Sequence, residues 1–324
     1  MRRTAASRTA RPFWAWARAI GGIAVLAALL VEVGTGPFVA GVRRIDGLVA
    51  GTALALGVLT TVCSAWRWRL IAAKLGVRLS LPRAVAAYYR SQFLNTTLPG
   101  GILGDVHRAV RHGRAIGDVG LGVRAVVVER VAGQAVVVAL AVLVLAVYPS
   151  PVRAYAEVAG IAAAAAAVGA ALLWRWAPSR RERSVWSDLL LPGRTWLGVA
   201  LLSGVVLAGH LATFLVAART AGATAPLLRL APLTLLALLA MMLPLNFAGW
   251  GPREGVAAWA FGAAGLTAGQ GVATAVTYGV LGLLACLPGA VVLLARAVPR
   301  RARPMPSVPI VPPVPVLASG DTHG

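Results

Sequence analysis

The sequence predicts an all-α membrane protein, and its composition, its apolar runs and the placement of its charges carry that prediction. Of its 324 residues, 59% are apolar and only 13% are charged, against roughly 45–50% and about 25% in soluble proteins. A soluble fold of this size could not cover its surface with so few charges. The apolar runs are long and unbroken, whereas a membrane β-barrel would show short alternating segments.

The net charge of +21 would ordinarily suggest a nucleic-acid partner. Here the arginines lie between the apolar runs, as topology signals do. Only Lys74 of the 31 basic residues is a lysine, a bias that a GC-rich genome explains. We therefore expect no nucleic-acid partner and place the chain in a bacterial plasma membrane.

The first half of the chain predicts three spans and one hairpin. Residues 13–33 follow a basic start (1–12) and predict an uncleaved first span, with a signal peptide as the alternative. Residues 47–65 predict the second span, and the basic stretch 66–90 predicts a cytoplasmic segment. Residues 91–104, SQFLNTTLPGGILG, are too interrupted to cross and predict a re-entrant hairpin on the cytoplasmic side. The third span is expected at 126–148.

The second half follows the same order. Spans are expected at 158–176, 197–218 and 271–295, and residues 230–266 predict a second broken hairpin. The first arm of that hairpin has about 17 residues, which could just span the hydrocarbon core. Seven or eight full crossings therefore remain an alternative to six spans and two hairpins. The Pro-rich tail, 299–324, predicts disordered cytoplasmic chain after a membrane domain at 13–298.

With both termini cytoplasmic, residues 13–148 and 158–295 make the same sequence of crossings in opposite orientation. This pattern predicts an inverted repeat, in which the broken segments meet near the bilayer midplane and form the substrate site.

Three acidic residues lie close to an arginine in otherwise apolar surroundings. The pairs are Asp105 with Arg108, Glu129 with Arg130 in the first turn of the third span, and Arg253 with Glu254. A charge in the hydrocarbon region costs at least about 2.5–3.5 kcal/mol, so such residues face a cavity or one another. The alternative is that they anchor helix ends at the interface.

Spacing predicts how these charges pair. Asp105 and Arg108 are three residues apart and share a helix face. Neighbours such as Arg253 and Glu254 point about 100° apart on a helix. We therefore expect cross-pairing between the broken segments and the third span, and one polar cavity that holds all six charges.

Glycines and prolines break both hairpins and leave backbone N–H groups free to bind an anion. The residues concerned are Pro99, Gly100, Gly101, Gly104, Gly249 and Gly251. Asn95 and Asn246 either satisfy the broken backbone or contact a headgroup, and the first role is the commoner one.

No nucleophile–base pair, metal site or nucleotide-binding motif emerges, so we expect no enzyme activity, metal or cofactor. His210 is interpreted as a packed or hydrogen-bonded core histidine. Cys63 and Cys286 are interpreted as small packing residues.

Three stretches together resemble the transmembrane domain of the lysylphosphatidylglycerol synthase/flippase family over roughly residues 15–296. They are NTTLPGGILGDVHRAVR, VVVERVAGQ and LPLNFAGWGPREGVAAWAFGAAGL. The residues that match the family's motifs are Asn95, Pro99, Gly100, Gly101, Gly104, Asp105, Glu129, Arg130, Gly251, Arg253, Glu254 and Gly255. Pro252 stands where the family more usually has valine.

The resemblance implies lipid translocation. Bifunctional members of the family carry a soluble aminoacyl-transfer domain, which we expect this chain to lack, together with the synthase activity. We expect a translocator of an anionic or modified phospholipid, or of a polyprenyl-linked lipid. Arg108, Arg130 and Arg253 are the candidate headgroup ligands.

Two alternatives stay open. One is a non-catalytic membrane partner of a separately encoded transferase. The other is an enzyme of polyprenyl-lipid glycan assembly, against which no Asp-x-Asp-type metal site is visible.

Overall fold

A computed structural model describes residues 27–28, 30–32, 34–98, 101–147, 193–242 and 250–297, and the regular elements in these ranges are α-helices. The predicted span at 158–176, the tail at 299–324, both termini and most of the predicted first span lie outside the described residues.

Four of the helices are long and apolar enough to cross a membrane. They are α3 (Gly47–Lys74), α6 (Val119–Val147), α9 (Arg194–Thr220) and α12 (Ala268–Ala297). A shorter helix, α2 (Gly36–Arg43), precedes them. The four long helices correspond to the four predicted spans that fall within the described ranges. An all-α membrane architecture is therefore confirmed.

Two pairs of shorter helices overlap the predicted broken hairpins, but the first pair, at 81–116, is much longer than the predicted 91–104. The first pair is α4 (Leu81–Thr97) with α5 (Leu103–Ile116), and the second is α10 (Leu227–Ala240) with α11 (Pro252–Ala263). At ~1.5 Å per residue, α10 is only about 21 Å long, less than the ~30 Å of a hydrocarbon core. In the first pair the chain turns through Gly101, whose φ of 62° is left-handed.

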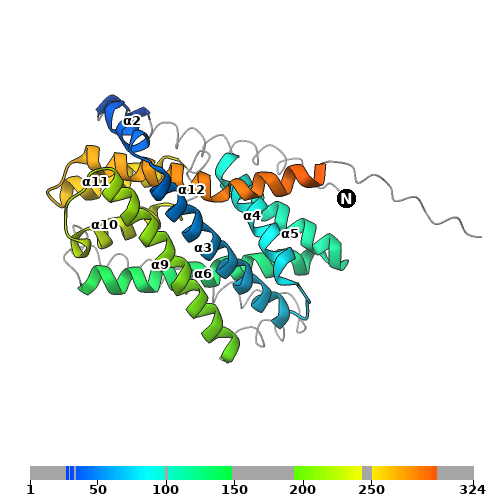
Figure 1. Ribbon diagram of the computed structural model, residues 1–324. Helices are drawn as coiled ribbons and strands as arrows, with labels where there is room; N and C mark the ends of the chain where they lie inside the picture. The colour runs from blue at the N-terminus through cyan, green and yellow to red at the C-terminus, as the bar shows by residue number, and fades with distance from the viewer. Residues whose placement is uncertain are drawn as a thin grey trace, which may run out of the picture.

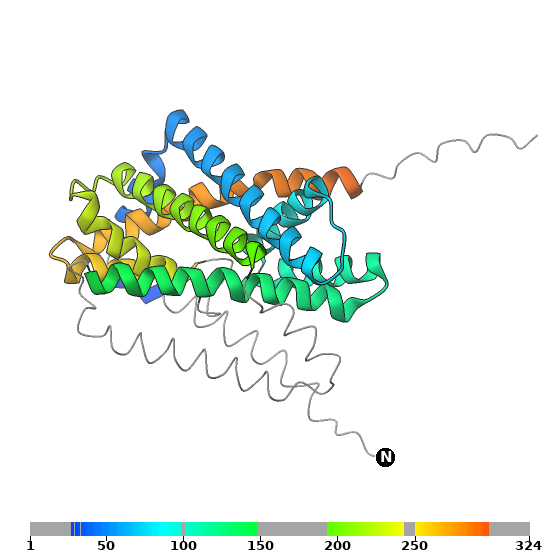
Figure 2. The same cartoon turned by 90° about the horizontal axis from the view of Figure 1, so that it is seen from below.

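The helices pack in a crossed arrangement. In Figure 1, α3 and α9 run side by side in opposite directions. Figures 1 and 2 show α6 and α12 on two sides of this pair, also running in opposite directions. The α4–α5 pair contacts both flanking helices, with α4 on α12 and α5 on α6, and α11 packs on α12. The order long helix, broken pair, long helix thus occurs in both halves of the chain.

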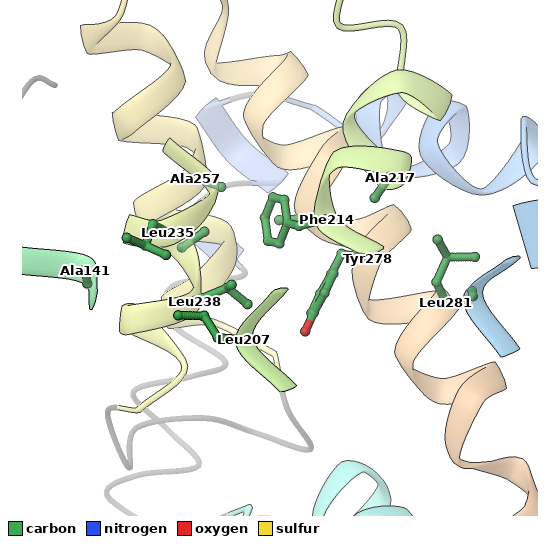
Figure 3. Packing of buried hydrophobic residues seen from close by; sticks show 12 residues of the cluster. Ala141, Leu207, Phe214, Ala217, Leu235, Leu238, Ala257, Tyr278 and Leu281 are labelled. Carbon is green, nitrogen blue, oxygen red and sulfur yellow. The ribbon is translucent and has the colours of Figure 1, made fainter. Parts of the chain in front are cut away.

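A buried apolar cluster joins α9, α10 and α12 (Figure 3). Leu207 and Phe214 of α9 meet Leu235 and Leu238 of α10 there. The ring of Phe214 lies 4.8 Å from that of Tyr278 on α12. This packing fixes Tyr278 on one wall of the site described below.

Besides the first hairpin, two predicted span boundaries are wrong. Helix α3 continues past residue 65 to Lys74, so Arg67 lies inside the helix rather than in a segment that follows it. Helix α6 begins at Val119, so Glu129 and Arg130 lie in its interior rather than in its first turn. A hydropathy pattern ends a span at its charges, but these charges have partners on other helices, and a helix continues through a charge that is compensated in this way.

Candidate functional site

Glu129 is the centre of a buried charge network. Its side chain is fully buried, and its Oε1 accepts hydrogen bonds from Arg67 Nε at 3.0 Å and from the Tyr88 hydroxyl at 3.0 Å. Its Oε2 accepts from Arg108 Nη2 at 3.0 Å. Arg67 Nη2 also pairs with Glu129, and Arg67 Nη1 donates to Ser203 Oγ at 3.0 Å. Helices α3, α4, α5, α6 and α9 therefore meet through this carboxylate and its partners.

Asp105, in the first turn of α5, extends the network. It accepts hydrogen bonds from Ser91 Oγ at 2.9 Å and from Asn95 Nδ2 at 3.0 Å. Arg108 Nη2 donates to it at 3.0 Å, which confirms that these two residues share a helix face. Arg130 pairs with its other oxygen. Cross-pairing between the first broken segment and the third span is therefore present.

Arg108 is fully enclosed by aromatic rings and carboxylates. Its guanidinium carbon lies 4.7 Å from the ring centroid of Trp68 and 4.3 Å from that of Tyr88. Both contacts are cation–π interactions, which strengthen where water is excluded. The side chain of Arg108 is 0% exposed, so it supports the site from behind rather than facing a ligand.

The second broken segment holds a separate ion pair. Gly251, with a φ of 120°, donates its N–H to Glu254 Oε2 at 2.8 Å and so begins α11. Glu254 Oε1 accepts from Arg253 Nε at 2.9 Å. The expectation that these neighbours find partners elsewhere is wrong, because the flexible arginine side chain folds back onto the capping carboxylate. The guanidinium of Arg253 also lies near the rings of Trp250 (5.3 Å) and Tyr278 (5.2 Å).

A cavity of about 340 Å³ lies between these two groups. Arg67, Arg130 and Arg253 all line it, and they come from α3, α6 and α11. Hydroxyl and amide side chains supply most of the remaining polar lining, together with His210, whose Nδ1 lies 3.0 Å from the Tyr278 hydroxyl. No carboxylate of the described residues faces the cavity: Asp105, Glu129 and Glu254 lie behind the arginines.

The structure places the predicted helix-break residues only in part. Asn95 Oδ1 accepts the N–H of Gly104 at 2.7 Å, which confirms its role in satisfying the broken backbone. A Cβ atom on Gly104 would collide with the Ser91 carbonyl, so only glycine lets α5 approach α4. Gly101 lines the cavity. The remaining candidates, Pro99, Gly100, Asn246 and Gly249, lie outside the described residues.

Sequence reasoning missed several residues of this site. The basic residues after position 65 predict a cytoplasmic segment that includes Arg67, although Thr60, Ser64 and Arg67 follow one another at helical spacing and all line the cavity. That polar stripe within an apolar run was the available signal. Tyr88 and Tyr278 belong to no comparable polar stripe, so the sequence does not predict their place in the site.

The described residues contain no group of three or more His, Cys, Asp or Glu that could hold a metal ion. Cys63 and Cys286 are both free and buried, as expected of small packing residues.

Long apolar helices around an arginine-lined cavity define a multi-pass membrane protein with a polar site between its helices. The family described as the lysylphosphatidylglycerol synthase TM region matches residues 14–290. The chain therefore belongs to this family, as the three motifs predict. A comparison with curated proteins finds no match.

Proposed function

We propose that this protein moves an anionic lipid headgroup between the two leaflets while the acyl chains stay in the bilayer. One observation carries the proposal: Arg67, Arg130 and Arg253, from three different helices, line a single cavity among apolar helices. A phosphate cannot enter hydrocarbon without losing its hydration. Arginine replaces that hydration well, because its planar fork binds a phosphate through two hydrogen bonds. The cargo is an anionic or modified phospholipid, or a polyprenyl-linked lipid.

The carboxylates behind the cavity keep the empty site stable. Asp105 pairs with Arg130, and Glu254 pairs with Arg253. A bound phosphate would compete with these carboxylates, so binding exchanges one ion pair for another and leaves the affinity moderate. The side chain of Arg130 is 40% exposed, and its buried Nε has no hydrogen-bond partner, so it retains donor capacity.

The opposite directions of α3 and α9, and of α6 and α12, support an inverted repeat of 13–148 and 158–295. In such a repeat, rocking of one half against the other opens a central site to each leaflet in turn. Both termini are then cytoplasmic, and the chain acts as a carrier without a cofactor or a catalytic step.

Liposomes reconstituted with the protein and a headgroup-labelled anionic lipid test this proposal. The wild-type protein should speed exposure of inner-leaflet label to an impermeant quencher, and Arg253→Ala should abolish the effect. Arg194→Ala provides a matched control, because Arg194 is exposed at the start of α9.

Equal rates for the wild-type protein and Arg253→Ala, with phospholipid and polyprenyl-phosphate probes alike, would contradict translocation by this cavity. That result would favour a membrane partner of a separately encoded transferase, since a scaffold tolerates loss of the cavity arginine.

A further inference from the structure

His210 is a titratable residue of the cavity that the proposed translocation does not use. It lies on α9, lines the cavity and is only partly buried. The other histidines that the structure describes, His107 and His112, lie on α5 and not in the cavity lining. Among the described residues of the lining, His210 is therefore the side chain whose type ordinarily changes charge near neutral pH.

The contact between His210 and Tyr278 suits both protonation states of the imidazole. His210 Nδ1 lies 3.0 Å from the Tyr278 hydroxyl, and the two ring centroids lie 6.5 Å apart. A hydroxyl both donates and accepts, so a neutral imidazole accepts its proton, whereas an imidazolium donates from the same Nδ1 to the tyrosine oxygen. The change requires only rotation of the O–H bond. Phe214, whose ring lies 4.8 Å from that of Tyr278, keeps this partner in place.

The charged groups that line the cavity with His210 are guanidiniums. Arg67 comes from α3 and Arg130 from α6, and the guanidinium of Arg253 on α11 lies 5.2 Å from the Tyr278 ring. Their carboxylate partners lie behind them and outside the lining. Like charges disfavour an imidazolium, so the described charges favour a neutral His210 while the cavity is empty.

The remaining titratable groups of the described lining are neutral in their ordinary state. They are Tyr88, Tyr278 and Cys286. Helix α10 also packs on α9 but contributes no titratable residue to the lining. The acidic residues at 157, 182 and 188 lie outside the described residues. A negative charge brought by a ligand would therefore be the first to face His210 from within the described lining.

We infer that His210 is a proton-binding site of this cavity and takes up a proton when a phosphate group binds there. The inference rests on the proposed function, which brings a phosphate to the arginines, and it concerns the phosphate alone rather than the rest of a headgroup. The phosphate offsets the charge of the arginines and stabilises the imidazolium, which then donates to Tyr278. Phosphate and proton are thereby linked, and each raises the affinity for the other by the same factor.

Proton uptake on binding is measured by calorimetry. Short-chain phosphatidylglycerol is a suitable probe, because its phosphodiester keeps its charge between pH 5.5 and 8 and exchanges no proton itself. The lipid is titrated into the purified full-length protein in a non-ionic detergent, in two buffers with different enthalpies of ionisation. The difference between the two measured heats gives the number of protons taken up. We expect uptake that rises to about one proton per bound lipid within this pH range.

Three variants assign the proton to His210. His210→Gln keeps a side chain that can hydrogen-bond to Tyr278 but takes up no proton, so uptake should vanish while binding persists. His107→Gln, at an exposed position of α5 outside the lining, should leave uptake unchanged. Tyr278→Phe keeps the ring and removes the hydroxyl. It should move the uptake to lower pH, because a hydrogen bond from a charged donor is worth more than one to a neutral imidazole.

The outcomes separate the inference from the proposed function. Lipid binding without proton uptake by the wild-type protein at any pH in the range overturns the inference and leaves translocation standing. Uptake that persists in His210→Gln, or an unchanged pH range in Tyr278→Phe, also overturns it. Uptake that depends on His210 in a protein that moves no lipid in liposomes supports the proton site and overturns the carrier. The wild-type titration decides even if a variant fails to fold.

Discussion

The buried carboxylate of Glu129 forms ion pairs with two guanidiniums on different helices. Arg67 and Arg108 both pair with it, and the Tyr88 hydroxyl donates to the oxygen that Arg67 contacts. The side chain of Arg108 is 0% exposed, so it has no water to replace a lost partner. The stability of the fold therefore depends on the charge of Glu129, because its removal takes a buried partner from both Arg67 and Arg108.

Glu129→Gln should therefore destabilise the protein by about 3–5 kcal/mol, the usual effect of breaking a buried ion pair on one side. The amide keeps the side-chain shape and removes only the charge. Thermal unfolding of purified protein in detergent, together with its expression level, measures the effect. Asp46→Asn is a suitable control, since Asp46 caps α3 through Val49 N–H and asparagine caps equally well. Equal stability of Glu129→Gln and the wild-type protein would contradict the charge network.

Gly279 and Gly282 provide a matched pair of substitutions on the cavity wall. A Cβ on Gly279 would collide with Arg253 Nη2 and lie 3.0 Å from the Trp250 ring, whereas one on Gly282 would meet nothing within 4 Å. Gly279→Ala should displace the Arg253 guanidinium and slow lipid translocation several-fold, and Gly282→Ala should not. Translocation assays with both variants measure the difference. Equal rates would show that the position of Arg253 is not limiting.

His112 should make stability depend on pH. Burial, and then the charge of Arg108, lower the pKa of this ring below its ordinary value. The folded protein therefore keeps His112 neutral, while the unfolded chain takes up a proton near pH 6.5. Stability is lost as the pH falls through that value. His112→Gln should reduce the fall in melting temperature between pH 7.5 and 5.5. An unchanged slope would indicate that His112 is protonated in the folded protein.

At the scale of helices, the sequence predicts the spans, whose positions depend on apolar length. It does not predict the helix ends that depend on contacts with other helices. The four described spans and the second broken pair fall where hydropathy and glycine or proline indicate, and the first broken pair overlaps its predicted hairpin but begins ten residues earlier, at Leu81. The end of α3 and the start of α6 differ from the prediction, because a charge inside an apolar run is tolerated only when another helix compensates it. Arg67 could be placed only once Glu129 was known to face it. The aromatic neighbours of Arg108 were unpredictable for the same reason.

The break between α4 and α5 predicts a specific pattern of accessibility. Thr97 and Leu98 are exposed at the end of α4, where the chain turns back. In a protein lacking Cys63 and Cys286, we expect cysteines at 97 and 98 to resist an impermeant thiol reagent added from outside the cell, because the hairpin is re-entrant from the cytoplasm. A cysteine replacing exposed Arg83 at the start of α4 serves as a cytoplasmic control. Labelling of position 97 or 98 from outside alone would show that the hairpin crosses the membrane.

Across the whole molecule, α3 and α9 form the central contact between the two halves of the chain. Both helices contribute lining to the cavity, Thr60 and Arg67 from α3 and His210 from α9. A carrier that exposes this cavity to each leaflet in turn must change the contact between these two helices. Whether α3 and α9 can move against each other therefore tests directly whether the two halves rock.

Thr60 and Gly209 allow that contact to be locked. A Cβ built on Gly209 lies 3.9 Å from Thr60 Cβ, close to the mean separation of about 3.8 Å in disulfides. In a background lacking Cys63 and Cys286, Thr60→Cys with Gly209→Cys should form a disulfide on oxidation. Translocation should then fall to the rate of protein-free liposomes and return on reduction, because the bond prevents the halves from moving apart. Thr60→Cys alone, treated with the same oxidant, controls for effects on the lipid and on single thiols. Full translocation in a protein shown by mass spectrometry to hold the disulfide would mean that α3 and α9 stay fixed and that access alternates through another pair of helices.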